Sequence, residues 1–132
     1  MKTIFTNGCF DILHPGHIEL FKYARSLGDK LIVGIDSDER IKQSKGSTRP
    51  IYNSNNRKFI LESIRYIDRV VVFNNDEELT NLVKYYSPYV MVVGSDWEGK
   101  QIIGSEYAKE INFFKRIQEF STTKTIENII NR

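Results

Sequence analysis

Predominantly apolar runs alternate along the chain with segments of helical pattern, and this alternation limits the folds that the chain can adopt. The clearest runs are Leu31–Ile35, Arg69–Phe73 and Tyr89–Val93. They do not alternate between polar and apolar residues, so strands formed from them are expected to be buried on both faces. The sequence therefore predicts an α/β protein with a parallel sheet of about five strands and helices on both faces.

The individual elements follow from periodicity and from turn and capping residues. Strands are predicted at residues 3–6, 31–35, 69–73, 89–93 and 113–117. Helices are predicted at residues 15–27, from 37 onward, at 56–66, 76–86 and 105–110, and from a cap at 121 to 130. A polar stretch at 43–56 is typical of a loop. No repeat or linker interrupts this order, so residues 1–132 are expected to form a single domain.

Composition and charge exclude several classes of protein. With 19 Lys and Arg against 17 Asp and Glu, the formal net charge is +2, which argues against a nucleic-acid partner. The apolar runs are only a few residues long, so no membrane span is expected. Cys9 is the only cysteine, which leaves no disulfide framework. A cytoplasmic enzyme or binding module is the expectation.

Polar and charged segments follow three of the predicted strands. They are Gly8–His17, Asp36–Asp38 and Gly94–Lys100. In open parallel sheets the ligand binds beyond the carboxyl ends of the strands, where the winding of the sheet reverses. These segments are therefore expected to meet at the ligand site.

Both histidines of the chain lie between the first strand and the first helix. Pro15 suits the first turn of a helix, so His14 is expected just before that turn and His17 within it. Gly16 has no side chain, which lets a phosphate approach the amides at the positive end of the helix. Imidazoles there can donate hydrogen bonds to phosphate oxygens and stabilise charge on a leaving pyrophosphate. The alternatives are that the histidines only cap the helix, or that they bind zinc, which two histidines alone do poorly.

The segment at 8–17 also carries a family signature. It reads Gly8-x-Phe10-Asp11-x-x-His14-x-Gly16-His17 and resembles that of the cytidylyltransferase-like nucleotidyltransferases, a superfamily with a Rossmann-like fold. The resemblance extends over nearly the whole chain. It implies that the phosphate of an acceptor attacks the α-phosphate of a nucleoside triphosphate directly, releasing pyrophosphate without a covalent enzyme intermediate. Mg²⁺ held mainly by the triphosphate is the implied cofactor.

The same resemblance implies roles for individual residues. The predicted catalytic residues are His14, His17, Lys45 and Arg57. The predicted nucleotide-binding residues are Asn7, Gly8, Cys9, Phe10, Asp11, Gly16, Asp96, Trp97, Arg116, Ser121, Thr122 and Thr123. Lys42 and Asp36 are predicted to bind the acceptor. For the loop lysines the alternative is a solvated charged loop.

Several of these residues have more than one interpretation. Asp11 would repel phosphates, so it is expected either to coordinate Mg²⁺ or to orient a loop amide. Trp97 is interpreted either as a contact of the base or as a structural plug. Ser121 is expected to cap the last helix as well as to contribute to triphosphate binding. Cys9 is interpreted as non-catalytic and Phe10 as a core residue.

Two subfamilies match different parts of the chain. Residues 96–100 and 61–68 resemble glycerol-3-phosphate cytidylyltransferases, which favours CTP and a phosphorylated polyol. Residues 45–50 and 103–106 resemble heptose-1-phosphate adenylyltransferases, which are usually one half of a bifunctional protein and would use ATP and a sugar 1-phosphate. The sequence prediction prefers the first. Three residues after Arg116, Glu119 stands where the cytidylyltransferase pattern has a glycine, so the chain departs from that pattern at this point.

A non-catalytic nucleotide-binding regulatory module is the alternative from a different class. Such a module would be expected to lose an imidazole or the phosphate lysine, whereas His14, His17, Lys45 and Arg57 are all present. A homodimer is also expected, with Tyr85, Tyr86 and Phe114 as apolar residues that would suit its interface.

Overall fold

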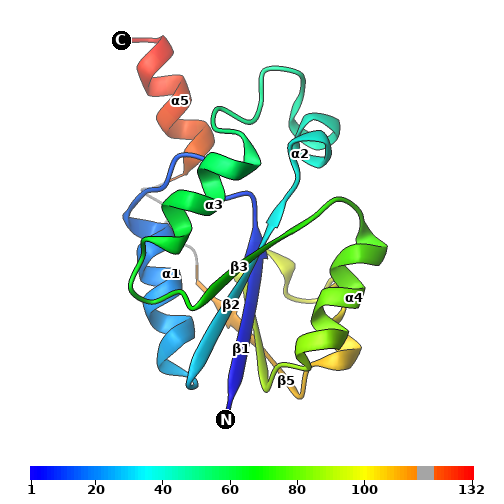
Figure 1. Ribbon diagram of the computed structural model, residues 1–132. Helices are drawn as coiled ribbons and strands as arrows, with labels where there is room; N and C mark the ends of the chain where they lie inside the picture. The colour runs from blue at the N-terminus through cyan, green and yellow to red at the C-terminus, as the bar shows by residue number, and fades with distance from the viewer. Residues whose placement is uncertain (116–120) are drawn as a thin grey trace.

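All neighbouring strands of the sheet run parallel, and their order is β3-β2-β1-β4-β5 (Figure 1). The computed structural model describes residues 1–115 and 121–132. The strands are β1 (Thr3–Gly8), β2 (Lys30–Asp36), β3 (Arg69–Phe73), β4 (Val90–Gly94) and β5 (Glu110–Phe114). The predicted α/β class with a Rossmann-like parallel sheet is confirmed.

Helices and short 3₁₀ turns connect the strands. They are α1 (Pro15–Ser26), α2 (Asp38–Lys45), α3 (Ser54–Glu62), α4 (Asp76–Tyr86), η1 (Ser95–Trp97), η2 (Ser105–Tyr107) and α5 (Thr122–Ile130). A side-chain oxygen caps the amino end of each of four helices, accepting a backbone N–H from the first turn, which fixes where the helix begins. The capping residues of α2, α3, α4 and α5 are Ser37, Asn53, Asn75 and Ser121.

The two faces of the sheet bury two separate hydrophobic clusters. Successive strand residues point to opposite faces, so Ile4 packs on the side of α1 and α3 while Phe5 packs on the side of α4. Phe21 of α1 belongs to the first cluster and Val83 of α4 to the second. Figure 1 shows the helices on either side of the sheet. The predicted covering of both faces is therefore confirmed.

Several boundaries differ from the sequence prediction, and the differences at α3, η2 and β5 have local causes. Helix α3 begins at Ser54 and not at residue 56, because Asn53 provides the cap. The helix predicted at 105–110 is only the single turn η2. Strand β5 begins at Glu110, three residues before the prediction, because the edge position of this strand allows polar residues that hide it in the sequence.

The winding of the sheet reverses at β1. Strand β2 lies on one side of β1 and β4 on the other, so the chain leaves these neighbouring strands in opposite directions. The loops after β1 and β4 therefore diverge at the carboxyl edge of the sheet and leave a crevice there. Helix α5 begins beside the loop after β1 and projects away from the sheet (Figure 1). Within the described residues, every helix is too short or too polar to cross a membrane.

Candidate active site

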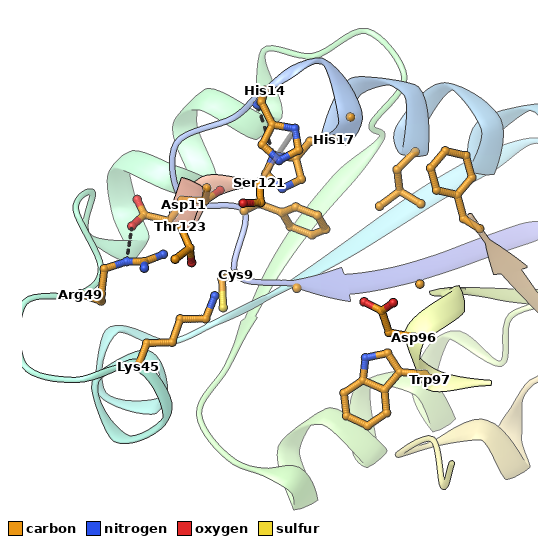
Figure 2. A pocket seen from close by; sticks show the side chains of 17 residues that line it. Cys9, Asp11, His14, His17, Lys45, Arg49, Asp96, Trp97, Ser121 and Thr123 are labelled. Atoms are coloured by element: carbon orange, nitrogen blue, oxygen red, sulfur yellow. Dashed lines mark hydrogen bonds and ion pairs between the residues drawn. The ribbon is translucent and has the colours of Figure 1, made fainter. Parts of the chain in front are cut away.

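A pocket of about 330 Å³ lies at this reversal point (Figure 2). Its walls come from the loop after β1, the start of α1, the end of α2 with the loop behind it, the end of β4, and the start of α5. The lining residues are Gly8, Cys9, Phe10, Asp11, His14, Gly16, His17, Leu20, Lys45, Arg49, Gly94, Asp96, Trp97, Phe114, Ser121, Thr122 and Thr123. Most of the predicted site residues therefore meet in one place.

The two histidines are stacked at the amino end of α1. His14 is the N-cap residue, and the ring centroids of His14 and His17 lie 3.7 Å apart with an angle of 18° between the ring planes. The backbone N–H of His14 donates to Nδ1 of His17 at 3.3 Å. A nitrogen that accepts a hydrogen bond carries no proton, so the proton of a neutral His17 is assigned to Nε2. The pair thus presents imidazole donors beside the positive end of the helix dipole.

The loop that carries the histidines has a strained backbone. Phe10 has φ 49° and Ile12 has φ 55°, in the left-handed region that residues with a Cβ rarely adopt. The conformation places the buried Phe10 ring edge-on to His17, with 5.3 Å between centroids, and also against Phe21. Strain of this kind persists where surrounding packing fixes it, and it is common at functional sites. The prediction that Phe10 is a core residue is confirmed, and Phe10 also supports His17.

The start of α5 is tied to the same loop. The hydroxyl of Thr122 donates to the carbonyl oxygen of Ile12 at 3.2 Å, and the Ser121 hydroxyl accepts from the N–H of Lys124. The predicted cap at Ser121 is confirmed. The amino ends of α5 and α1 thus both lie at the pocket, where their helix dipoles favour an anion.

Arg57 lies near the start of α3, as predicted, but its guanidinium is enclosed by protein groups. It is 1% exposed and does not line the pocket. Its guanidinium donates to the carbonyl oxygens of Cys9, Asp36 and Tyr52 at 3.0, 2.8 and 3.0 Å, and to the Asp38 carboxylate at 2.8 Å. Because these contacts use most of its donors, the geometry favours a positioning role for Arg57 over the predicted direct contact with phosphate. It holds together the ends of β1 and β2 and the loop before α3.

The structure distinguishes between the two interpretations of Asp11. Its carboxylate is buried, and its oxygens accept from the backbone N–H groups of Ile51 and Tyr52 at 2.6 and 2.9 Å. Of the two interpretations, orienting loop amides is the one that the geometry supports, and a role as a Mg²⁺ ligand is not. In the part of the chain that the structure describes, no three metal-ligating side chains form a cluster. The described residues thus do not fit a protein-built metal cage.

The predicted acceptor-binding residues do not reach the pocket. Lys42 is exposed on α2, and Asp36 pairs with Arg40 at 2.7 Å; neither lines the pocket. Asn7, predicted to bind the nucleotide, lies in β1 and is also absent from the lining. Lys45, the last residue of α2, lines the pocket and Lys42 does not. The binding roles of Lys42, Asp36 and Asn7 stay predictions.

Other predicted residues lie as follows. Lys45 ends α2 and extends toward Cys9 (Figure 2). Asp96 and Trp97 line the opposite wall from the turn after β4, and Trp97 is half exposed. Arg116 lies outside the described residues. Arg49 lines the pocket and was not among the predicted site residues, although it belongs to the same Lys45–Pro50 motif as Lys45.

The thiol of Cys9 is held in its neutral form. Burial and the neighbouring Asp36 carboxylate raise its pKa from 9.0 to about 11, and Sγ donates to Asp36 Oδ2 at 3.4 Å. A thiolate is the reactive form of cysteine, so a neutral thiol is a poor nucleophile. This agrees with the interpretation of Cys9 as non-catalytic.

Cys9 should react slowly with iodoacetamide in the folded protein. A pKa raised from 9.0 to about 11 lowers the thiolate fraction at pH 8 by about 10²-fold relative to an unperturbed thiol. Mass spectrometry of the native protein and of the urea-unfolded protein at pH 8 measures this ratio. Equal alkylation rates in the two states would contradict the raised pKa.

A parallel sheet with a pocket at the point where its winding reverses is the arrangement of an open α/β ligand-binding protein. Residues 5–128 match the model of the cytidylyltransferase-like family, and the chain belongs to that family. The predicted recognition of this family is confirmed, and with it the coarser prediction of a nucleotidyltransferase.

Two relatives illustrate the sequence similarity. The bifunctional protein HldE of Aliarcobacter butzleri (strain RM4018) is 45% identical over 128 residues, which are 97% of this chain and 27% of that protein. The bifunctional protein HldE of Helicobacter pylori (strain ATCC 700392 / 26695) is 45% identical over 97% of this chain and 28% of its own length. The chain thus spans little more than a quarter of these relatives. They give no support to the glycerol-3-phosphate type.

Solved structures agree with the fold. The lipopolysaccharide core biosynthesis protein of Thermoplasma volcanium GSS1 superposes with a TM-score of 0.70 at 25% identity, covering 87% of this chain and 98% of that one. The pantothenate synthetase of Thermus thermophilus gives a TM-score of 0.61 at 12% identity, covering 87% of this chain and 56% of that one. The second likeness concerns the fold alone.

Proposed function

We propose that this chain transfers AMP from ATP to a sugar 1-phosphate, with release of pyrophosphate. The observation that carries the proposal is the stacked pair His14 and His17 at the amino end of α1, in a pocket shared with Lys45 and the start of α5. These groups surround one crevice with imidazoles, amides and a cation, all of which suit phosphate oxygens.

The choice of a sugar 1-phosphate and ATP has two supports. Residues 45–50 and 103–106 resemble heptose-1-phosphate adenylyltransferases, which are usually one half of a bifunctional protein. The relatives named above are bifunctional proteins, and this chain matches about a quarter of their length. The two observations agree. They favour ATP and a sugar 1-phosphate over CTP and glycerol 3-phosphate, the substrates that the resemblance of residues 96–100 had favoured.

The chemistry is a single displacement at phosphorus. An oxygen of the acceptor phosphate attacks the α-phosphorus of ATP, and the bond from that phosphorus to the oxygen bridging to the β-phosphate breaks. Pyrophosphate leaves with the electron pair, and the products are a nucleotide sugar and pyrophosphate. In this scheme His14, His17 and Lys45 stabilise the charge that grows on the leaving group, so catalysis consists of positioning and electrostatics.

Three further features belong to the same proposal. Mg²⁺ would be bound through triphosphate oxygens, because Asp11 uses its carboxylate for loop amides. Trp97 and Asp96 face the crevice from the β4 side and would lie beside the nucleotide. A homodimer remains a proposal; Tyr85 is 80% exposed on α4 and available for such a contact. The alternative, a regulatory module without catalysis, would be excluded by the observation of turnover.

A screen of two nucleotides against two acceptors tests the proposal. ATP and CTP are each combined with heptose 1-phosphate and with glycerol 3-phosphate, and pyrophosphate is measured. We expect ATP with heptose 1-phosphate to give a kcat/KM at least about 10-fold above that of each of the other three pairs. A 10-fold preference corresponds to a difference of about 1.4 kcal/mol in transition-state free energy. A preference for CTP with glycerol 3-phosphate would restore the cytidylyltransferase reading, and no pyrophosphate from any pair would favour the regulatory module.

A further inference from the structure

Arg49 offers the pocket hydrogen-bond donors that the protein itself does not use. Its side chain is 11% exposed, and Nε and Nη2 are buried without a hydrogen-bond partner among the described residues. Nearly all buried polar groups in folded proteins have such a partner, because leaving a buried donor unpaired is costly. A buried guanidinium with two unused nitrogen atoms therefore points to a partner that the chain does not supply.

Asp11 is the charged neighbour of Arg49, but it does not satisfy these donors. The distance from Arg49 Nε to Asp11 Oδ2 is 3.9 Å, beyond hydrogen-bond length. The carboxylate oxygens of Asp11 are already directed to the N–H groups of Ile51 and Tyr52 at 2.6 and 2.9 Å. Asp11 thus offsets part of the charge of Arg49 while the N–H groups of Arg49 stay available.

The position of Arg49 shows which kind of partner fits. Arg49 lines the pocket together with Lys45, and Figure 2 shows both side chains extending from the loop side toward Thr123 and Cys9. The amino ends of two helices, α1 and α5, face the same space, so the local field favours an anion. A planar guanidinium matches the geometry of a phosphate, which accepts two parallel hydrogen bonds from it.

We infer that Arg49 is a phosphate-binding residue of this site, which donates through its free nitrogen atoms to a phosphate group of a substrate. The inference deepens the proposed function and rests on it for the nature of the substrates. Two substrate groups could accept these hydrogen bonds: the triphosphate of the nucleotide and the phosphate of the acceptor. Arg49 then has the role that the sequence had suggested for Arg57, whose donors are used by backbone carbonyls.

The test compares Arg49→Gln and Arg49→Lys with a matched control, Arg69→Gln. Arg69 is exposed at the start of β3, at the opposite end of the sheet from the pocket. Calorimetric titration measures the Kd for ATP and for pyrophosphate, steady-state assays give the KM for heptose 1-phosphate, and thermal unfolding gives the Tm. We expect Arg49→Gln to weaken at least one of these ligands by about 10-fold or more, as for loss of a charge-assisted hydrogen bond, with a partial loss in Arg49→Lys and none in Arg69→Gln.

The ligand affected identifies the phosphate. Weaker ATP and pyrophosphate binding with an unchanged KM for heptose 1-phosphate assigns Arg49 to the triphosphate, and the reverse assigns it to the acceptor. Unchanged affinity for all three ligands overturns the inference, whether or not the Tm falls; a lower Tm alone would make Arg49 a structural partner of Asp11. If the wild-type protein binds pyrophosphate but turns over no acceptor, the proposed function is contradicted. The inference about Arg49 is then still tested, by comparing the affinity for pyrophosphate of Arg49→Gln with that of the wild-type protein.

Discussion

Replacing His17 by Ala is expected to lower kcat by about 10²-fold or more, with a smaller effect on nucleotide binding. The expectation follows from the loss of a preorganised donor at a group whose charge grows in the transition state. His14→Ala should have an effect of similar size, because the two rings are stacked 3.7 Å apart on the same helix end. Rapid-quench measurement of pyrophosphate formation at saturating substrates gives kcat for each variant.

His14 requires a second variant because it is also the N-cap residue of α1. Asparagine is a favourable cap, so His14→Asn keeps the helix start while removing the imidazole. If His14 acts on phosphate, His14→Asn should recover the Tm of the wild-type protein and stay slow. Recovery of kcat by asparagine would mean that His14 serves only the helix, and near wild-type activity in both alanine variants would remove the catalytic assignment of the pair.

Arg57→Met is expected to lower the free energy of unfolding by roughly 3–5 kcal/mol, the usual cost of removing one partner from a buried charged network. Three backbone carbonyls and the Asp38 carboxylate lose a donor together. Arg57→Lys should also be costly, since one ammonium cannot reach four acceptors placed around a planar group. Urea unfolding followed by circular dichroism measures the loss.

The same variants separate a structural role from a phosphate clamp. If Arg57 only positions the loops, Arg57→Lys protein that is folded at low temperature should bind pyrophosphate almost as tightly as the wild-type protein does. We expect a Kd within about 3-fold of the wild-type value, which is a difference in binding free energy below about 1 kcal/mol. Stability within about 1 kcal/mol of wild type, combined with a large loss of pyrophosphate binding, would return Arg57 to the pocket. Arg69→Met, at an exposed position, is the matched control.

Much of the fold could be predicted because its signals are local. Apolar strands, Pro15 at the start of α1 and Ser121 at the start of α5 each act within a few residues, and the structure has them as expected. The edge strand β5 was misplaced because strands at a sheet edge carry polar residues and lose the apolar pattern.

The pocket residues divide in the same way. His14 and His17 could be placed because they lie between a strand and a helix start, whose geometry is fixed. Arg49 and Arg57 could not be told apart, because both bracket one polar loop and only the path of that loop decides which guanidinium is enclosed by carbonyls. Spacing within a motif indicates that two residues lie near a site, whereas the direction of each side chain depends on tertiary contacts.

Direct transfer in this pocket is the central claim, and acceptor dependence tests it most directly. The protein is incubated with ATP, Mg²⁺ and labelled pyrophosphate, with and without heptose 1-phosphate, and products are identified by mass spectrometry. The account predicts a nucleotide sugar and pyrophosphate in equal amounts when the acceptor is present. Without the acceptor it predicts no pyrophosphate release, no exchange of label into ATP and no adenylylated protein. Exchange of label without the acceptor, or AMP attached to the chain, would contradict the single displacement.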